Sequence, residues 1–182
     1  MPLATTLIFI SGHCGILNMK ASDPIKIPDL ADVAFKVEGG IVLRSFNINE
    51  ASKVFKTVKA NTERLLKYMH WMTLDYSLKM AEEFVERSRA NARKGESLSL
   101  GIFQEERLIG VIGFVGFDTI VRKTEIGYWI DGDWEGKGII SNGVRLLIDF
   151  AFNELSMNRI EIRCSATNVR SAAVPKRMGF LQ

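Results

Sequence analysis

EIGYWIDGDWEGKGII, residues 125–140, is the stretch that decides the fold. Its first six residues are mostly aromatic or β-branched, as in a strand. Gly132, Gly136 and Gly138 then mark a turn, and apolar residues at helical spacing follow from Lys137. A helix that begins directly after a glycine turn leaves its first backbone N–H groups unpaired, and such a helix start binds phosphate well. The stretch therefore predicts a strand, a turn and a helix that together hold an anion.

The chain after this stretch continues with regular patterns. Apolar residues from Lys137 to about Leu155 form one stripe of a helix. Residues 159–164 alternate between apolar and polar types, which predicts a half-buried strand. Residues 168–178 are expected to form a last short helix that ends at Gly179.

Three strands are expected before and within the opening stretch, at residues 97–104, 107–117 and 123–130. The polar pair Glu105 and Glu106 suits a hairpin between the first two. Three glycines lie among large apolar residues of the middle strand, Gly110, Gly113 and Gly116. Glycines in such a place predict a close backbone approach or a bulge.

The N-terminal half adds one strand and two helices. Residues 41–46 are rich in β-branched residues, and Asn49 can cap a helix whose apolar pattern runs to Leu66. Ser77 can cap a second helix that ends near Gly95. The order strand, two helices, three strands, helix, strand, helix indicates an α/β chain with a mixed sheet and helices on both faces. A doubly wound nucleotide fold is excluded because its strand–helix alternation is missing.

Residues 1–36 are interpreted as an N-terminal extension and linker, disordered or spurious, ahead of a domain at residues 37–182. The run from Leu3 to Leu17 is apolar but lacks a preceding basic residue, and it is too short to span a bilayer. A secretion signal is the second interpretation. Met19 is a plausible true start, and Pro24 and Pro28 favour a linker.

Composition narrows the class of protein. The 182 residues carry a net charge of +3, too mild to argue for nucleic acid but suited to a polyanionic ligand. Two cysteines (Cys14, Cys164) and two histidines (His13, His70) lack disulfide or metal-ligand spacing, so no metal site is expected. The balance predicts a reducing, cytoplasmic location without a membrane span.

Residues 37–180, and most strongly the part from Glu125 onward, resemble the GNAT acyltransferases, within them the RimJ/RimL-type N-acetyltransferases. The family loop, Gln/Arg-x-x-Gly-x-Gly/Ala, falls on residues 135–140, with Gly138 as its central glycine. Glu135 departs from the usual Gln or Arg, and Ile140 departs from a small residue. A carboxylate repels a diphosphate, so Glu135 is expected to point away and to contribute only its backbone.

The resemblance implies an acetyl-CoA site. The strand at 125–130 would be splayed from the next strand and pair with the pantetheine amides near Tyr128 and Ile130. Asn168 would contact the pantetheine arm, and it can also serve as an ordinary helix cap, since the two roles are compatible. The residues that the resemblance assigns to the cofactor are Tyr128, Trp129, Ile130, Glu135, Gly136, Lys137, Gly138, Ile139, Ile140, Asn168 and Ser171.

The implied reaction is direct attack of an amine on the thioester in a ternary complex. Glu125 is the first candidate for the general base and Glu96 the second, and a solvated surface carboxylate is the alternative for both. Ser171 matches the helix serine that protonates the departing thiolate, with an ordinary first-turn serine as the alternative. Cys164 is expected to be an inert buried thiol. Tyr68, His70 and Trp71 are candidates for the acceptor side, with core packing as the simpler interpretation.

Relatives in this family continue through two more strands after the position of Gln182, so the sequence predicts a GNAT fold that lacks its last two strands. An unpaired edge on the strand at 159–164, or a homodimer that covers it, would follow. The implied acceptor is the N-terminal α-amine of a protein, with ribosomal proteins the usual target of the family. A small amine such as a polyamine or aminoglycoside, and a non-catalytic acetyl-CoA-binding module, remain alternatives.

Overall fold

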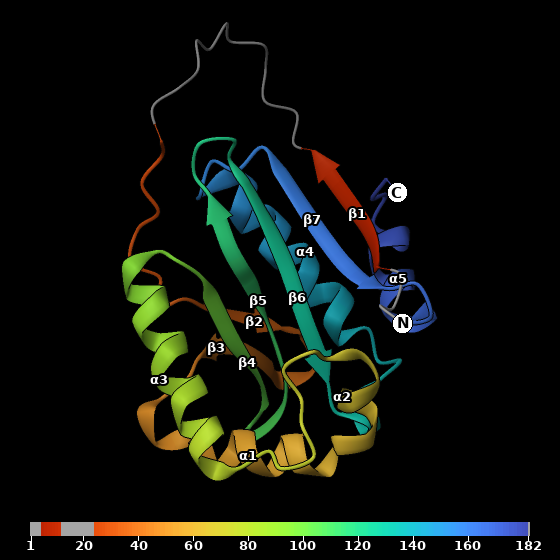
Figure 1. Cartoon of the computed structure of the whole chain (residues 1–182). Helices are drawn as coiled ribbons and strands as arrows, with labels where there is room; N and C mark the ends of the chain where they lie inside the picture. Colours follow the sequence, from red (N-terminus) through yellow and green to blue (C-terminus); the bar gives the residue numbers. More distant parts are fainter. Residues whose placement is uncertain (1–4, 12–23, 182) are drawn as a thin grey trace, which may run out of the picture.

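The computed structural model describes the backbone of residues 5–11 and all atoms of residues 24–181. Seven strands form one mixed sheet in the order β1-β7-β6-β5-β4-β3-β2 (Figure 1). The strands are β1 (Thr5–Ser11), β2 (Ala34–Val37), β3 (Ile41–Ser45), β4 (Leu98–Gln104), β5 (Arg107–Asp118), β6 (Lys123–Ile130) and β7 (Arg159–Ser165). Among the strands that the structure describes, only β6 and β7 are parallel neighbours, because a helix crosses over between them. The predicted mixed sheet is confirmed.

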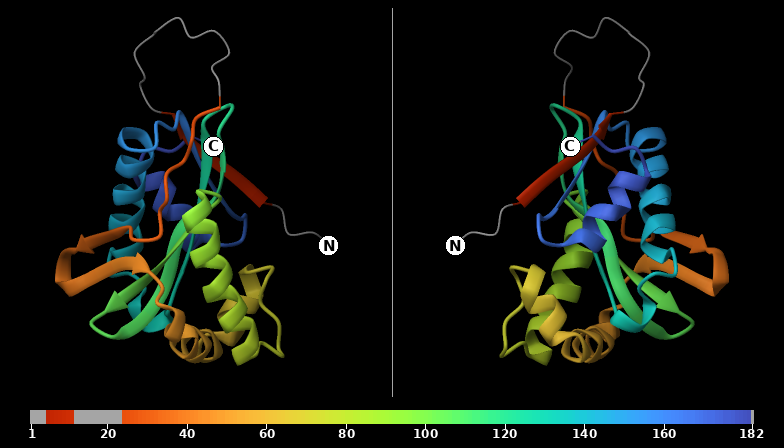
Figure 2. Two further views of the ribbon diagram at one scale, coloured as in Figure 1. Left: turned by 90° about the vertical axis from the view of Figure 1, so that its left-hand side faces the viewer. Right: turned by 90° about the vertical axis from the view of Figure 1, so that its right-hand side faces the viewer.

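Helices cover both faces of this sheet, as predicted (Figure 2). One face carries α1 (Ala51–Ala60), α2 (Thr62–Tyr68) and α3 (Leu78–Lys94), and the other carries α4 (Ile139–Asn153) and α5 (Val169–Arg177). Among the helices in the described part of the chain, none is both long and apolar enough to cross a membrane.

Two separate cores hold these layers together. Under α4, the buried side chains of Ile139, Val144 and Leu147 pack with sheet residues such as Ile112. On the opposite face, Val54 of α1 and Val85 of α3 belong to a second buried cluster. The sheet is therefore apolar on both faces, and this explains the nearly continuous apolar runs in β4 and β5.

The β4–β5 hairpin confirms the prediction at Glu105 and Glu106, since Glu105 adopts a left-handed turn conformation with φ 51°. The glycines of β5 serve the expected purpose. A Cβ at Gly113 would collide with the carbonyl of Leu98 on β4, and Gly116 lies in a register shift between Phe114 and Phe117. Close approach and bulge are both present in this strand.

The single helix expected from Asn49 to Leu66 is divided into α1 and α2 at Asn61. Asn61 is 5% exposed and leaves the helical conformation. Its amide donates to the carbonyl of Thr57 at 3.0 Å and accepts from the N–H of Gly132 at 3.0 Å. The hydrogen bond from Gly132 to the Asn61 side chain holds this residue outside the helical conformation and so explains the break. No local sequence pattern predicts it.

The linker predicted up to residue 36 is wrong for the part that the structure describes. Ile27 and Leu30 are 7% and 1% exposed and belong to the core under α4. The strand β2 pairs with β3 in an antiparallel register that runs from Ala34 opposite Arg44 to Val37 opposite Ile41. Burial of apolar residues outweighs the extended bias of Pro24 and Pro28, so the domain begins before residue 37.

The unpaired edge predicted for β7 is also wrong. The backbone of Thr5–Ser11 pairs antiparallel with all of Arg159–Ser165, so β1 supplies the hydrogen-bond partners of that edge (Figure 1). Disorder is thereby contradicted for residues 5–11. Met19, the proposed true start, and the end of the apolar run from Leu3 to Leu17 lie outside the described residues.

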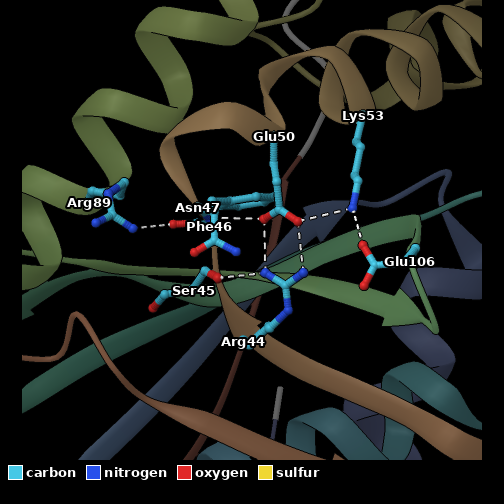
Figure 3. Close-up of polar contacts among 8 residues, drawn as sticks. All are labelled: Arg44, Ser45, Phe46, Asn47, Glu50, Lys53, Arg89 and Glu106. Carbon is cyan, nitrogen blue, oxygen red and sulfur yellow. Dashed lines mark hydrogen bonds and ion pairs between the residues drawn. The ribbon is translucent and has the colours of Figure 1, made fainter.

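An ion-pair cluster fixes the entry to α1 (Figure 3). Glu50 is 5% exposed, and its carboxylate accepts from Arg44 at 2.7 and 2.8 Å and from the N–H of Asn47 at 2.9 Å. Lys53 bridges Glu50 at 3.2 Å to Glu106 at 2.6 Å. Burial alone would raise the pKa of the Glu50 carboxyl, but these donors outweigh burial and lower its pKa to about 2.

Candidate active site

The strands β6 and β7 separate halfway along their length. Their parallel pairing is confined to Lys123–Glu125 opposite Arg159–Glu161. Beyond this point β6 continues to Ile130 with only β5 beside it. Within the part of the chain that the structure describes, backbone N–H and C=O groups on the open edge of β6 therefore have no strand partner, as the family resemblance led us to expect.

The loop after β6 is shaped by two glycines. Gly136 and Gly138 have φ values of 75° and 77°, which favour glycine strongly. Gly138 is the N-cap of α4 and, with no side chain of its own, gives the helix no side-chain cap. The first N–H groups of this 15-residue helix are thus available to an anion, and the helix dipole favours negative charge at the same place.

A cavity of about 1010 Å³ lies between the open edge of β6, the loop and α5. It brings together ten of the eleven residues assigned to the cofactor from sequence: Tyr128, Trp129, Ile130, Glu135, Gly136, Gly138, Ile139, Ile140, Asn168 and Ser171. Lys137 is not among the lining residues, and its ammonium lies 4.3 Å from the centroid of the Trp134 ring. We call this cavity the cofactor cleft.

Charged side chains at the cofactor cleft were missed by the sequence analysis. Arg64, Lys67, Arg170 and Arg177 line it, and Glu135 is the one carboxylate among its lining residues in the described part of the chain. Glu135 does not simply turn away, because its carboxylate pairs with both Arg64 of α2 and Arg170 of α5. Arg170 could have been noticed beside Ser171, whereas Arg64 and Lys67 look like ordinary charges on a surface helix.

A pair of hydroxyl groups lies inside the cofactor cleft. Tyr128 donates to the carbonyl of Ser171 at 3.0 Å, and the Ser171 hydroxyl donates to the Tyr128 oxygen at 3.2 Å. Burial raises the pKa of Tyr128 to about 12, so its phenol stays protonated at neutral pH. Asn168 accepts from the N–H of Ser171 at 3.1 Å and is indeed a helix cap.

Cys164 is buried at 8% exposure, and burial raises the pKa of its thiol. A buried thiol that stays protonated is a poor nucleophile, which agrees with the inert role expected from the sequence.

The two carboxylates predicted as general bases lie outside both cavities. Glu125 forms an ion pair with Arg163, and neither Glu125 nor Glu96 lines the cofactor cleft or the cavity described next.

A second cavity, of about 440 Å³, opens on the other side of β6, between the sheet, α1 and α3. We call it the acceptor cavity. Trp71, Tyr76 and Trp129 form an aromatic wall, with centroids 6.0 Å apart for Trp71 and Tyr76 and 6.4 Å for the two tryptophans. Glu83 and Arg87 are its charged lining residues.

The two cavities share Met69, Tyr128 and Trp129, so they meet across one strand. Of the acceptor-side residues suggested by the sequence, Trp71 lines the acceptor cavity and Tyr68 lines the cofactor cleft. His70 lines neither cavity and is exposed. A site with two chambers that meet at Tyr128 suits a reaction between two substrates.

Comparisons with known proteins agree with this geometry. The chain is 34% identical over 151 residues to the putative ribosomal N-acetyltransferase YdaF of Bacillus subtilis, covering 81% of each chain. It is 28% identical to the ribosomal-protein-serine acetyltransferase of Escherichia coli, covering 80% of this chain and 82% of that protein. RimL, a ribosomal L7/L12 alpha-N-protein acetyltransferase solved in complex with coenzyme A, shares the fold with a TM-score of 0.76 at 23% identity, covering 81% and 83%.

The sequence profile of one family covers most of the domain. It is described as the acetyltransferase (GNAT) domain, and it matches residues 41–181. This range includes both cavities and every residue assigned to them from sequence. The chain belongs to the GNAT family of acetyltransferases.

Proposed function

We propose that the protein transfers an acetyl group from acetyl-CoA to the N-terminal α-amine of a protein, by direct attack in a ternary complex. The meeting of the cofactor cleft and the acceptor cavity at Tyr128 and Trp129 carries this proposal, because it brings two substrates into reach without a covalent enzyme intermediate. Ribosomal proteins are the acceptors we favour, because two of the relatives are named for them.

The chain offers several groups that fit coenzyme A. The free N–H groups at the start of α4 suit its diphosphate, and the open backbone edge of β6 suits the amides of its pantetheine arm. Four cations line the cleft, as a ligand with several phosphates requires. When bound, acetyl-CoA supplies an activated acyl group as a thioester.

We assign proton transfer to one group in each cavity. Ser171 lines the cofactor cleft with its hydroxyl hydrogen-bonded to Tyr128, and this supports a role for it as the donor of the proton that the departing thiolate needs. An N-terminal α-amine has a pKa of about 7.7–8.0, so only modest help from a base is needed to make it neutral. Glu83 lines the acceptor cavity and can provide this help, directly or through water. Glu125, the base predicted from sequence, pairs with Arg163 and lines neither cavity.

The lining of the acceptor cavity is also compatible with a small amine as the acceptor. Its aromatic wall and the carboxylate of Glu83 are features that also bind a small organic cation, although Arg87 lines the same cavity. A polyamine or an aminoglycoside is therefore the second candidate acceptor.

One experiment separates the candidates. The protein is incubated with acetyl-CoA and a panel of N-terminal peptides, polyamines and aminoglycosides, and products are identified by mass spectrometry. We expect a gain of one acetyl group on the α-amine of peptides that carry ribosomal-protein N-termini. If only the small amines are acetylated, the acceptor is a small amine and not a protein N-terminus. Stabilisation by coenzyme A with no product from any member would leave only a binding module.

A further inference from the structure

The carboxylate of Glu135 joins two helices that are far apart in the sequence. One of its oxygens pairs with Arg64 on α2, and the other pairs with Arg170 on α5. All three residues line the cofactor cleft, and Glu135 stands directly before Gly136 in the loop that leads into α4. Arg64 also lies over Gly132, where an added Cβ would collide with its guanidinium. We call Arg64, Glu135 and Arg170 the ionic bridge.

The ionic bridge is too exposed to be a strong structural contact. The side chains of Arg170, Arg64 and Glu135 are 83%, 43% and 23% exposed. Exposed ion pairs contribute little to stability, because water and salt screen them and two long side chains lose freedom in forming them. The partners of such a pair can be exchanged at small cost.

The ionic bridge lines the same cleft as the expected phosphate site at the start of α4. The free N–H groups at the start of α4 lie only a few residues after Glu135 in the chain. An unpaired carboxylate there would repel a diphosphate, whereas a carboxylate held by two guanidinium groups is neutralised. Guanidinium groups bind phosphate through paired, charge-assisted hydrogen bonds, and the diphosphate as a whole carries more negative charge than one carboxylate.

We propose that Arg64 and Arg170 are phosphate ligands for coenzyme A, and that Glu135 is a built-in anion that holds both side chains until the phosphates displace it. This inference rests on the proposed acetyl-CoA function. Glu135, the departure from the family loop, thus acts as an internal competitor of the cofactor. Its presence makes binding weaker than the arginines alone would allow, and it keeps them aimed at the cleft when the cleft is empty.

The test is the dissociation constant of coenzyme A, measured by titration calorimetry with the intact protein. We expect Arg64→Gln and Arg170→Gln each to raise it by about fivefold to tenfold. Glu135→Gln, which keeps the size of the side chain but removes its charge, should lower it by about threefold to fivefold. Arg93→Gln, at an exposed position on α3 away from both cavities, is the matched charge control and should leave it unchanged.

Ligands with fewer phosphates identify which group is bound. Dephospho-CoA lacks the 3′-phosphate, and pantetheine lacks all phosphates. If an arginine binds the 3′-phosphate, its variant should match wild type toward dephospho-CoA. If it binds the diphosphate, the loss should persist there, and in both cases the variants should equal wild type toward pantetheine.

Two results would overturn the inference while leaving the proposed function intact. In one, wild type binds coenzyme A and the arginine variants bind it equally well. In the other, Glu135→Gln weakens binding as much as the arginine variants do, which would make Glu135 a positioning residue and no competitor. If wild type itself shows no affinity for coenzyme A, the proposed function fails first.

Discussion

Glu50 and Glu135 each hold two cations, but their surroundings give them opposite roles. The side chain of Glu50 is 7% exposed, and it accepts from Arg44, Lys53 and the backbone of Asn47 (Figure 3). The side chain of Glu135 is 23% exposed, and its partner Arg170 is 83% exposed. A buried carboxylate with several donors is expensive to unpair, whereas an exposed one can exchange its partners. The cluster at Glu50 therefore stabilises the fold, whereas the cluster at Glu135 can release its arginines to a ligand.

Removing the charge of Glu50 should have the largest effect on stability. Glu50→Gln leaves the guanidinium of Arg44 without its carboxylate at the junction of β3 and α1. We expect the free energy of unfolding to fall by about 3 kcal/mol, measured by urea denaturation at pH 7. Glu135→Gln is the matched control and should change it by no more than about 0.5 kcal/mol. Equal losses in the two variants would remove the distinction between the clusters.

The same comparison predicts a dependence on pH. The pKa of Glu50 is lowered from 4.5 to about 2 in the folded protein, so the folded state binds its proton less readily than the unfolded chain does. The stabilisation is complete above about pH 4.5 and is lost as the pH falls toward 2. Unfolding free energies at pH 7 and at pH 3 should therefore differ less in Glu50→Gln than in wild type. A constant gap between the two proteins would show that Glu50 is not the group that titrates.

A substitution at Ser171, inside the cofactor cleft, should lower turnover and leave the free energy of unfolding nearly unchanged. Ser171→Ala removes the hydroxyl that donates to Tyr128 at 3.2 Å. We expect kcat to fall by about tenfold to a hundredfold, with a nearly unchanged dissociation constant for coenzyme A, in steady-state assays and calorimetry. Cys164→Ala, a change at a buried neighbour on β7, should retain full activity. A Ser171→Ala enzyme as fast as wild type would make Ser171 only a first-turn helix residue.

How far the sequence predicts this molecule depends on whether the signal is local. The strand, glycine turn and helix at residues 125–140 could be predicted, because periodicity and glycine placement determine them within one segment. The splitting of a helix at Asn61 could not, because its cause is a hydrogen bond to Gly132 across the fold. β2 was missed for a similar reason: its pairing with β3 and the burial of Leu30 outweigh two nearby prolines.

The same distinction between local and long-range signals applies to the candidate site. Backbone features of the cofactor cleft follow from motifs, since glycines and a helix start are visible as sequence patterns. Arg64 and Arg170 were missed, because an exposed arginine on a helix looks the same whether it faces solvent or a ligand. The acceptor cavity is assembled from α1, α3 and three strands, and no single segment carries its signature.

A substitution at a third carboxylate, Glu125, should have the smallest effect on activity. It was predicted as the general base, but Arg163 holds it and it lines neither cavity. We expect Glu125→Gln to change kcat/KM by less than about twofold, because a base must reach the proton that it removes. Glu83 lines the acceptor cavity, so Glu83→Gln should lower kcat/KM for an N-terminal peptide by a larger factor. Assays of both variants from pH 6 to 9 decide the matter. If the Glu125 variant loses more activity than the Glu83 variant, Glu125 is restored as the base predicted from sequence.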